Sequence, residues 1–204
     1  MLNFSPAISK DNFFDDPHQI IKTTKNISFK KSNYISGCRS EDILNINKNL
    51  FEYINKKVVE NYFAGSKKFT FEAESYFQKS DPDINDGWVH QDHSDLTAVI
   101  YLTYGGTSGT SIYDLKEEYL FPDWSVGGDK HRYFGNKENY SDEEKNKIQE
   151  EKLKNNSFFN KTINFEGKFN RMICFDSRQF HASDICDKER LVIISFIYNV
   201  KNVW

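Results

Sequence analysis

The sequence predicts a mainly β domain with flanking helices, an α+β chain arranged as an antiparallel sandwich or jelly roll. One helical hydrophobic pattern near the start is followed by many short segments with a strand pattern, and this order favours a sheet sandwich supported by helices. The chain has 204 residues, of which 38% are hydrophobic and 16% aromatic. This composition is globular and sufficient for one core, so we expect a single domain over residues 1–204.

Residues 41–63 are predicted to form an amphipathic helix that supports the N-terminal side of the domain. Its apolar side chains recur at intervals of three and four residues: Ile43, Ile46, Leu50, Ile54, Val58 and Tyr62. Ser40 is the expected N-cap, and Glu41 and Asp42 complement the helix dipole in the first turn.

After this helix the hydrophobic period changes to two, which indicates strands. Within residues 69–76, one set of side chains (Phe69, Phe71, Ala73 and Ser75) alternates with a more polar set (Thr70, Glu72, Glu74 and Tyr76). Further strand-like segments are residues 86–90, 97–104, 109–113, 161–165, 171–176 and 190–198. The pairs Gly105-Gly106 and Ser108-Gly109 indicate turns between them.

Residues 115–160 interrupt the strands with a stretch rich in Lys, Glu and Asn. Within it, a polar helix is predicted to begin at Ser141, where Glu144 completes a capping box. A polar segment this long is either a tolerated insertion or a lid over a site, and both interpretations stay open.

Charge and cysteine content exclude several classes of protein. The net charge of −3 gives no electrostatic support for nucleic-acid binding or for an anionic membrane surface. Neither a signal peptide nor an apolar run of about 20 residues is visible, so no membrane span is expected. Cys38, Cys174 and Cys186 are too few and too scattered for a disulfide framework, which predicts reduced, partly buried thiols in a cytoplasmic protein.

Two overlapping His-x-Asp patterns, His90-Gln91-Asp92 and His93-Ser94-Asp95, are the main chemical signal. Non-haem Fe(II) sites commonly use two histidines and one carboxylate, and residues two apart on a strand point the same way. Trp88 and Val89 suit the end of a buried strand, whereas residues 93–95 precede the next apolar run and suit a turn. We therefore favour His90 and Asp92 as metal ligands, with His93 and Asp95 as the alternative pair.

A third ligand and an anion-binding residue follow later in the chain. His181 comes at the end of a probable strand, whereas His18 and His131 lie in polar stretches and are expected at the surface. Arg190 opens the apolar strand 190–198, where a planar guanidinium at the mouth of a barrel would bind a carboxylate through two hydrogen bonds.

With these residues, the sequence resembles the Fe(II)- and 2-oxoglutarate-dependent dioxygenases of the prolyl-hydroxylase-like group. The motif of that family is matched by His90, Asp92, His181 and Arg190. The flanking stretches "WVHQD", "AVIYLT", "GGTSGTSIY" and "NRMICFDSRQFHAS" are similar to its core strands. Upstream, "NYISGCRSEDI" is similar to a "YPGxRS" segment found in one branch.

The resemblance implies a double-stranded β-helix, a cupin-like barrel, in which His90, Asp92 and His181 hold Fe(II). It also implies that Arg190 and Tyr101 bind the co-substrate 2-oxoglutarate, and that O₂ is consumed. Decarboxylation of 2-oxoglutarate would be coupled to hydroxylation of a small-molecule or peptide substrate, such as a prolyl residue or an amino acid. Members that halogenate lack the carboxylate ligand, so Asp92 favours hydroxylation.

The substrate does not follow from the resemblance, because Thr103 and the segment 115–160 depart from the family pattern where substrate would bind. Two other function classes remain open. One is a non-catalytic jelly-roll protein that binds metal or ligand. The other is a cupin-type metalloenzyme that does not use 2-oxoglutarate, a class that Arg190 argues against.

Overall fold

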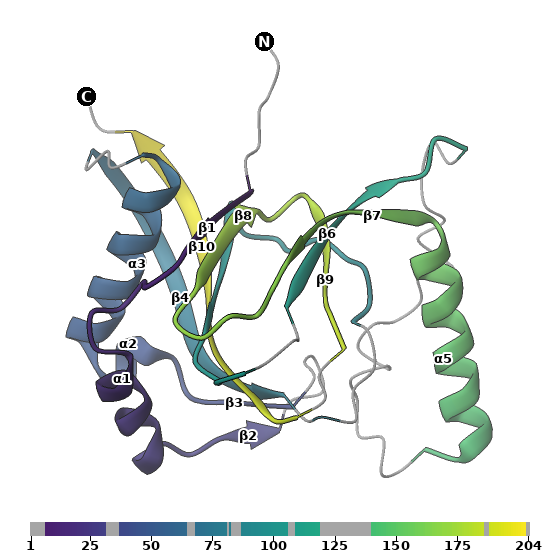
Figure 1. Cartoon of the computed structure of the whole chain (residues 1–204), viewed down its shortest axis with the longest axis horizontal. Helices are drawn as coiled ribbons and strands as arrows, with labels where there is room; N and C mark the ends of the chain where they lie inside the picture. Colours follow the sequence, from purple (N-terminus) through teal and green to yellow (C-terminus); the bar gives the residue numbers. More distant parts are fainter. Residues whose placement is uncertain are drawn as a thin grey trace.

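The computed structural model describes residues 7–31, 37–64, 68–80, 82, 87–105, 109–118, 140–185 and 188–202. Figure 1 shows two antiparallel sheets that face each other, with helices outside both of them. This is the jelly-roll, or double-stranded β-helix, architecture, so the predicted fold class is confirmed.

The larger sheet has seven strands and the smaller sheet has three. In spatial order the larger sheet contains β1 (Ala7–Lys10), β8 (Met172–Asp176), β5 (Leu96–Tyr101), β10 (Arg190–Asn202), β4 (Phe69–Ser80), β3 (Cys38–Arg39) and β2 (Lys30–Lys31). The smaller sheet contains β7 (Phe159–Phe165), β6 (Thr110–Leu115) and β9 (Phe180–Ser183). Neighbours in the larger sheet, such as β5 and β10, are distant in sequence, so long-range pairing determines the fold.

Helices cover the outer face of the larger sheet: α1 (Pro17–Thr23), the 3-10 helix η1 (Thr24–Asn26), α2 (Ile43–Ile46) and α3 (Lys48–Tyr62). The apolar side of α3 packs on the sheet through Ile54 and Val58, which are fully buried beside Phe77 and Ile193. In the described ranges, no helix has the length and apolar character needed to cross a bilayer.

The predicted helix over 41–63 is formed as two helices with a break at Asn47. The Asn47 side chain caps α3, and the Asp42 side chain caps α2. The prediction that Ser40 is the N-cap is therefore wrong. Ser40 is buried, and its hydroxyl accepts a hydrogen bond from the backbone N–H of Phe77 in β4 at 3.1 Å. The hydroxyl therefore binds a sheet amide in place of the helix N-terminus.

The alternation predicted for residues 69–76 separates the two faces of the larger sheet. Phe69, Phe71 and Ala73 pack toward the helices. Side chains on the other face of β4, such as Gln78, point into the sandwich, because Gln78 lies opposite Val192 in the register. An inner apolar cluster closes the space between the sheets: Val99, Tyr101, Ile112, Ile173, Phe175 and Val192.

Helix α5 (Asp142–Ser157) lies outside the smaller sheet, on the right in Figure 1. Its predicted capping box is confirmed: the Glu144 carboxylate accepts from the Ser141 N–H at 2.9 Å, and the Glu144 N–H donates to the Ser141 hydroxyl at 3.2 Å. The rest of the predicted insertion or lid falls mainly at 119–139, which lies outside the described residues.

The thiols of Cys38 and Cys174 are free, as predicted; Cys38 is half-buried and Cys174 is fully buried. Cys186 lies outside the described residues. Burial without a charged partner raises the pKa of Cys174 well above its usual range, so this thiol is unreactive.

Replacing Asn55 by alanine should destabilise the fold, because Asn55 joins α3 to the sheet through buried hydrogen bonds. Its amide donates to the Ser75 hydroxyl at 2.9 Å, and Ser75 is in turn 2.9 Å from the Ser195 hydroxyl. We expect a loss of about 1–3 kcal/mol of unfolding free energy in urea titrations.

The matched control is Asn45→Ala, at an exposed helical asparagine whose side chain bonds only to Glu41 within the described residues. It should change the unfolding free energy by less than about 0.5 kcal/mol. Equal effects of the two substitutions would contradict a structural role for the Asn55 bonds.

Candidate functional site

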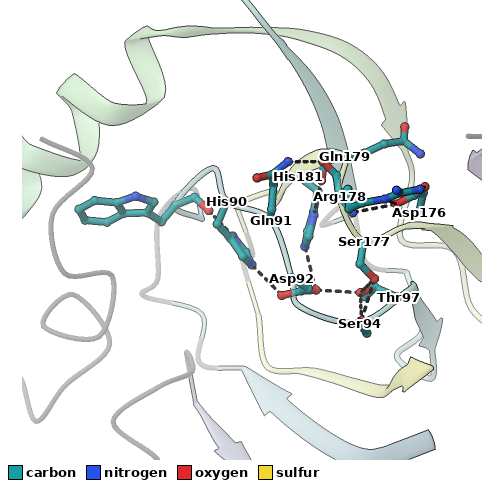
Figure 2. Close-up of polar contacts among 11 residues, drawn as sticks. His90, Gln91, Asp92, Ser94, Thr97, Asp176, Ser177, Arg178, Gln179 and His181 are labelled. Carbon is teal, nitrogen blue, oxygen red and sulfur yellow. Dashed lines mark hydrogen bonds and ion pairs between the residues drawn. The ribbon is translucent and has the colours of Figure 1, made fainter. Parts of the chain in front are cut away.

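The structure brings His90, Asp92 and His181 together at one end of the sandwich. One ligand atom from each residue lies within 4.8 Å of the others. The Nε2 atom of His90 is 3.5 Å from Asp92 Oδ1, and that of His181 is 3.2 Å from Asp92 Oδ2. Figure 2 shows both contacts as dashed lines that meet at Asp92. Both imidazoles therefore direct a nitrogen toward the same carboxylate.

Backbone hydrogen bonds hold the three residues in this arrangement. His90 and His181 face each other in an antiparallel bridge, with N···O distances of 3.0 and 2.8 Å. Such a pair holds the two side chains on one face, and their ring centroids are 4.4 Å apart. The Asp92 N–H donates to the carbonyl of Ser177 at 3.0 Å, which joins the carboxylate-bearing segment to the turn after β8.

His181 is expected from the sequence at the end of a probable strand, and the strand predicted at 171–176 is confirmed as β8. In the structure β8 ends at Asp176, residues 177–179 form a turn, and His181 belongs to β9 in the smaller sheet. The side chain of Asp176 accepts from the N–H of Arg178 at 2.9 Å and stabilises this turn.

The imidazole tautomers suit a metal. Nδ1 of His90 lies 2.6 Å from the Trp88 carbonyl, and Nδ1 of His181 lies 2.9 Å from the Gln179 carbonyl. A carbonyl only accepts, so each Nδ1 is the donor and each neutral ring presents its Nε2 lone pair to Asp92. Lone pairs that face a carboxylate need a cation between them, either protons or a metal ion, so this donor set fits a metal.

Asp92 is held by a chain of hydroxyl groups below it, also visible in Figure 2. The Thr97 hydroxyl donates to Asp92 Oδ2 at 2.8 Å and lies 2.8 Å from the Ser177 hydroxyl, which is 2.7 Å from Ser94. Burial alone would raise the pKa of Asp92, but when protons rather than a metal ion lie between the rings and the carboxylate, the hydrogen bonds from His181 and His90 hold this pKa well below its ordinary value. The carboxylate is therefore ionised and fixed in orientation.

The alternative pair does not join this cluster. His93 and Asp95 are both exposed, in the bend that precedes β5. The Asp95 carboxylate instead accepts a hydrogen bond from the backbone N–H of Val200 at 3.0 Å. The two overlapping patterns therefore have different roles, with His90-Asp92 in the site and His93-Asp95 in the connection.

Sequence reasoning missed the residues that hold the His90 segment from behind. Asn156 on α5 accepts from the Val89 N–H at 2.9 Å and donates to the Gly87 carbonyl at 3.0 Å. The neighbouring Asn155 donates to the Val89 carbonyl at 3.0 Å. Trp88 is buried against Ile148 of the same helix. Asparagines at the end of a polar helix are common, so nothing in the local sequence predicts that Asn155 and Asn156 bind the backbone beside His90.

Arg190 and Tyr101 lie next to each other on the inner face of the larger sheet. Tyr101 is opposite Val192, two residues after Arg190, so all three side chains share one face. Arg190 is 9% exposed and donates to the Gly109 carbonyl at 3.2 Å. The Tyr101 hydroxyl lies 2.8 Å from that of Thr110, and burial raises the pKa of Tyr101 to about 12.

The remaining residues considered from sequence lie away from the site or outside the described ranges. His18 is exposed and bonds to the Tyr104 hydroxyl at 2.9 Å, so it is a surface residue as predicted. Trp88 is buried, as expected for the end of a buried strand. His131 lies outside the described residues.

Comparison of the sequence with protein families gave one match. The family model described as "Family of unknown function (DUF6445)" matches residues 3–193. No curated protein matched the chain significantly.

Several solved structures share this fold. An oxidoreductase of the 2OG-Fe(II) oxygenase family from Burkholderia pseudomallei has a TM-score of 0.57 and 10% identity over 97% of this chain and 86% of its own. A prolyl hydroxylase from Trichoplax adhaerens, in complex with a hypoxia inducible factor peptide, has a TM-score of 0.55 and 12% identity over 97% and 85%. HygX from Streptomyces hygroscopicus, with nickel and 2-oxoglutarate bound, has a TM-score of 0.56 and 8% identity over 95% and 83%. Identities this low establish similarity of fold.

Replacing Thr97 by valine should weaken metal binding at the candidate site, because Asp92 loses the hydroxyl that fixes its orientation. Removal of such a supporting hydrogen bond typically costs about 10- to 100-fold in metal affinity. Titration calorimetry with Mn(II) measures the change. Thr70→Val, the same substitution at an exposed position of β4, should leave the affinity unchanged. Unaltered Mn(II) affinity in Thr97→Val would show that Asp92 needs no such support.

Proposed function

The chain belongs to the DUF6445 family, and we propose that it is an Fe(II)- and 2-oxoglutarate-dependent oxygenase that hydroxylates its substrate. The observation that carries this proposal is the cluster of His90, Asp92 and His181 at the end of a jelly roll. The fold shared with 2-oxoglutarate–Fe(II) oxygenases supports it.

Two imidazole nitrogens and one carboxylate on one face are the ligand set of non-haem Fe(II) oxygenases, which leaves other positions open. His90, Asp92 and His181 would hold the ion through Nε2, a carboxylate oxygen and Nε2. Bound there, Fe(II) would supply the activation of O₂, a redox chemistry that side chains lack. The chain itself contributes the fixed tautomers and the oriented carboxylate.

Arg190 and Tyr101 are the residues that we expect to bind 2-oxoglutarate. Arg190 offers a guanidinium at the inner end of the sandwich, where low dielectric strengthens an ion pair with a carboxylate. With its pKa raised to about 12, Tyr101 stays protonated at physiological pH and can donate a hydrogen bond. Ile112 connects the two regions, since it pairs with His181 and packs in the cluster that contains Tyr101.

The proposal extends to the organisation and location of the protein. We infer one oxygenase domain over residues 1–204, because α5, within the segment 115–160, bonds directly to the backbone beside His90. A lid role for that segment remains a hypothesis. The free thiols of Cys38 and Cys174 support a reducing, cytoplasmic location.

Substitution of the histidines should separate the two candidate ligand pairs. His90→Ala and His181→Ala each remove a ligand, and we expect Mn(II) affinity to fall by more than about 100-fold and succinate formation from 2-oxoglutarate to cease. His93→Ala is the matched control and should retain both. Full metal affinity and turnover in His90→Ala would refute the proposal.

Replacing Arg190 by glutamine should raise the Kd of 2-oxoglutarate by about 10- to 100-fold, as expected for the loss of a charged hydrogen-bonding partner. Calorimetry with the Mn(II)-loaded protein measures this constant, and Mn(II) affinity itself should not change. Lys201→Gln removes the same charge from an exposed part of β10 and serves as control. If the Kd of 2-oxoglutarate were the same in Arg190→Gln, Arg190 would not bind the co-substrate, and a cupin-type enzyme that does not use 2-oxoglutarate would be favoured.

A further inference from the structure

A second arginine, Arg39, faces the interior of the sandwich from β3. In the register Arg39 lies opposite Gln78, Gln78 opposite Val192, and Val192 opposite Tyr101. Residues that face each other across paired strands share one side of a sheet, so this row crosses the inner face from Tyr101 to Arg39. Arg39 therefore lies at the far end of the row from the site assigned to 2-oxoglutarate.

Backbone contacts of residues 37–40 fix the position of Arg39. Gly37 has φ of +93°, and a Cβ atom there would lie 1.9 Å from the carbonyl oxygen of Lys79. Glycine thus allows β3 to approach β4 closely. Ser40 then binds Phe77 through both its N–H and its hydroxyl, which fixes the next residue after Arg39.

The Arg39 guanidinium is held on one edge and stacked on rings. Its Nε donates to Gln78 Oε1 at 2.8 Å, and its central carbon is 5.3 Å from the ring centroids of both Tyr76 and Phe196. Within the part of the chain that the structure describes, its two terminal NH₂ groups have no side-chain hydrogen bond and no ion pair. Burial lowers the pKa of Arg39, although the group remains charged.

Arg39 lies on the same face of the larger sheet as the residues that support the candidate metal centre. Phe196, beneath the guanidinium, lies opposite Thr97 in the register, and Thr97 donates to Asp92. The carboxylate of Asp92 is close enough to interact electrostatically with Arg39. The nearby Glu74 accepts from the Tyr76 hydroxyl at 3.3 Å and makes no ion pair with Arg39 in the described ranges.

There is room beside Arg39 for a small molecule. Arg39 and Tyr76 line a cavity of about 690 Å³, within the range typical of ligand pockets. Its other walls come from residues 26–31, which include Lys30 and Lys31, and from Ser40, Glu41 and Ile46, so the cavity lies at the β2–β3 edge of the sheet and Arg39 separates it from the metal cluster. The walls are therefore cationic overall, which favours an anionic ligand.

We propose that Arg39 binds a carboxylate of the substrate and positions that substrate beside the metal centre, so that the substrate is a small organic acid, an amino acid or a peptide C-terminus. This inference rests on the proposed oxygenase function. A planar guanidinium held by Gln78 presents two N–H groups in the geometry that a carboxylate accepts. The co-substrate carboxylate is assigned to Arg190, at the opposite end of the row.

The test measures succinate formation with Fe(II), 2-oxoglutarate and O₂ in the presence of added probes. The probes are the common amino acids and a set of tripeptides, each as the free acid and as the C-terminal amide. We expect free acids to stimulate turnover at least about 10-fold more effectively than their amides, the effect of one charged hydrogen-bonded pair. Comparison of amino acids with tripeptides distinguishes a free acid from a chain terminus.

The variant Arg39→Gln should raise the KM of the stimulating acid at least about 10-fold and abolish the preference for acid over amide. Its Kd for 2-oxoglutarate and its Mn(II) affinity should change by less than about twofold, and Arg39→Lys should recover part of the preference. The control is Lys79→Gln, which removes one positive charge from the residue after Gln78, on the opposite face of β4. It should leave the KM and the preference for acid over amide unchanged.

Three results would overturn the inference: no free acid stimulates turnover, acids and amides stimulate equally, or the preference survives in Arg39→Gln. If Arg39→Gln instead weakens the binding of 2-oxoglutarate, Arg39 binds the co-substrate and the inference is also wrong. Failure of the wild-type chain to bind 2-oxoglutarate at all contradicts the oxygenase proposal instead, so the two failures are distinguishable.

Discussion

The two hydrogen bonds between His90 and His181 join the segment before β5 to the smaller sheet, and the candidate site depends on them. The two segments are far apart in sequence, so these hydrogen bonds form only when the two sheets face each other. Once it forms, both imidazoles lie on one face. The bond from the Asp92 N–H to Ser177 then brings the carboxylate to the two rings, and the Thr97 hydroxyl fixes its orientation. The geometry of the site is therefore a property of the closed sandwich.

The polar groups inside the sandwich differ in burial. Arg190 and Tyr101 are buried, Asp92 and Arg39 are half-buried, and Glu74 is exposed. Ile112 packs in the apolar cluster that contains Tyr101 and pairs with His181. Two arginines, Arg190 and Arg39, thus share the inner face of the larger sheet with the residues that support Asp92.

The sequence could predict the parts of this structure that follow from local periodicity. The strands and the capping box at Ser141 depend on neighbouring residues, and so does the grouping of His90 with Asp92. Other features depend on distant partners. The break at Asn47 follows from competition for caps, and the role of Asn156 follows from a helix that packs against a segment far away in sequence. Arg39 gave no signal of its own, because its direction is set by strand pairing.

The asparagine clamp on α5 couples the candidate site to a helix outside the smaller sheet. Asn155 and Asn156 bind the backbone of residues 87–89, and the capping box at Ser141 stabilises the start of the same helix. A change that unfolds α5 would therefore release the segment that carries His90, although the helix contributes none of the three clustered side chains.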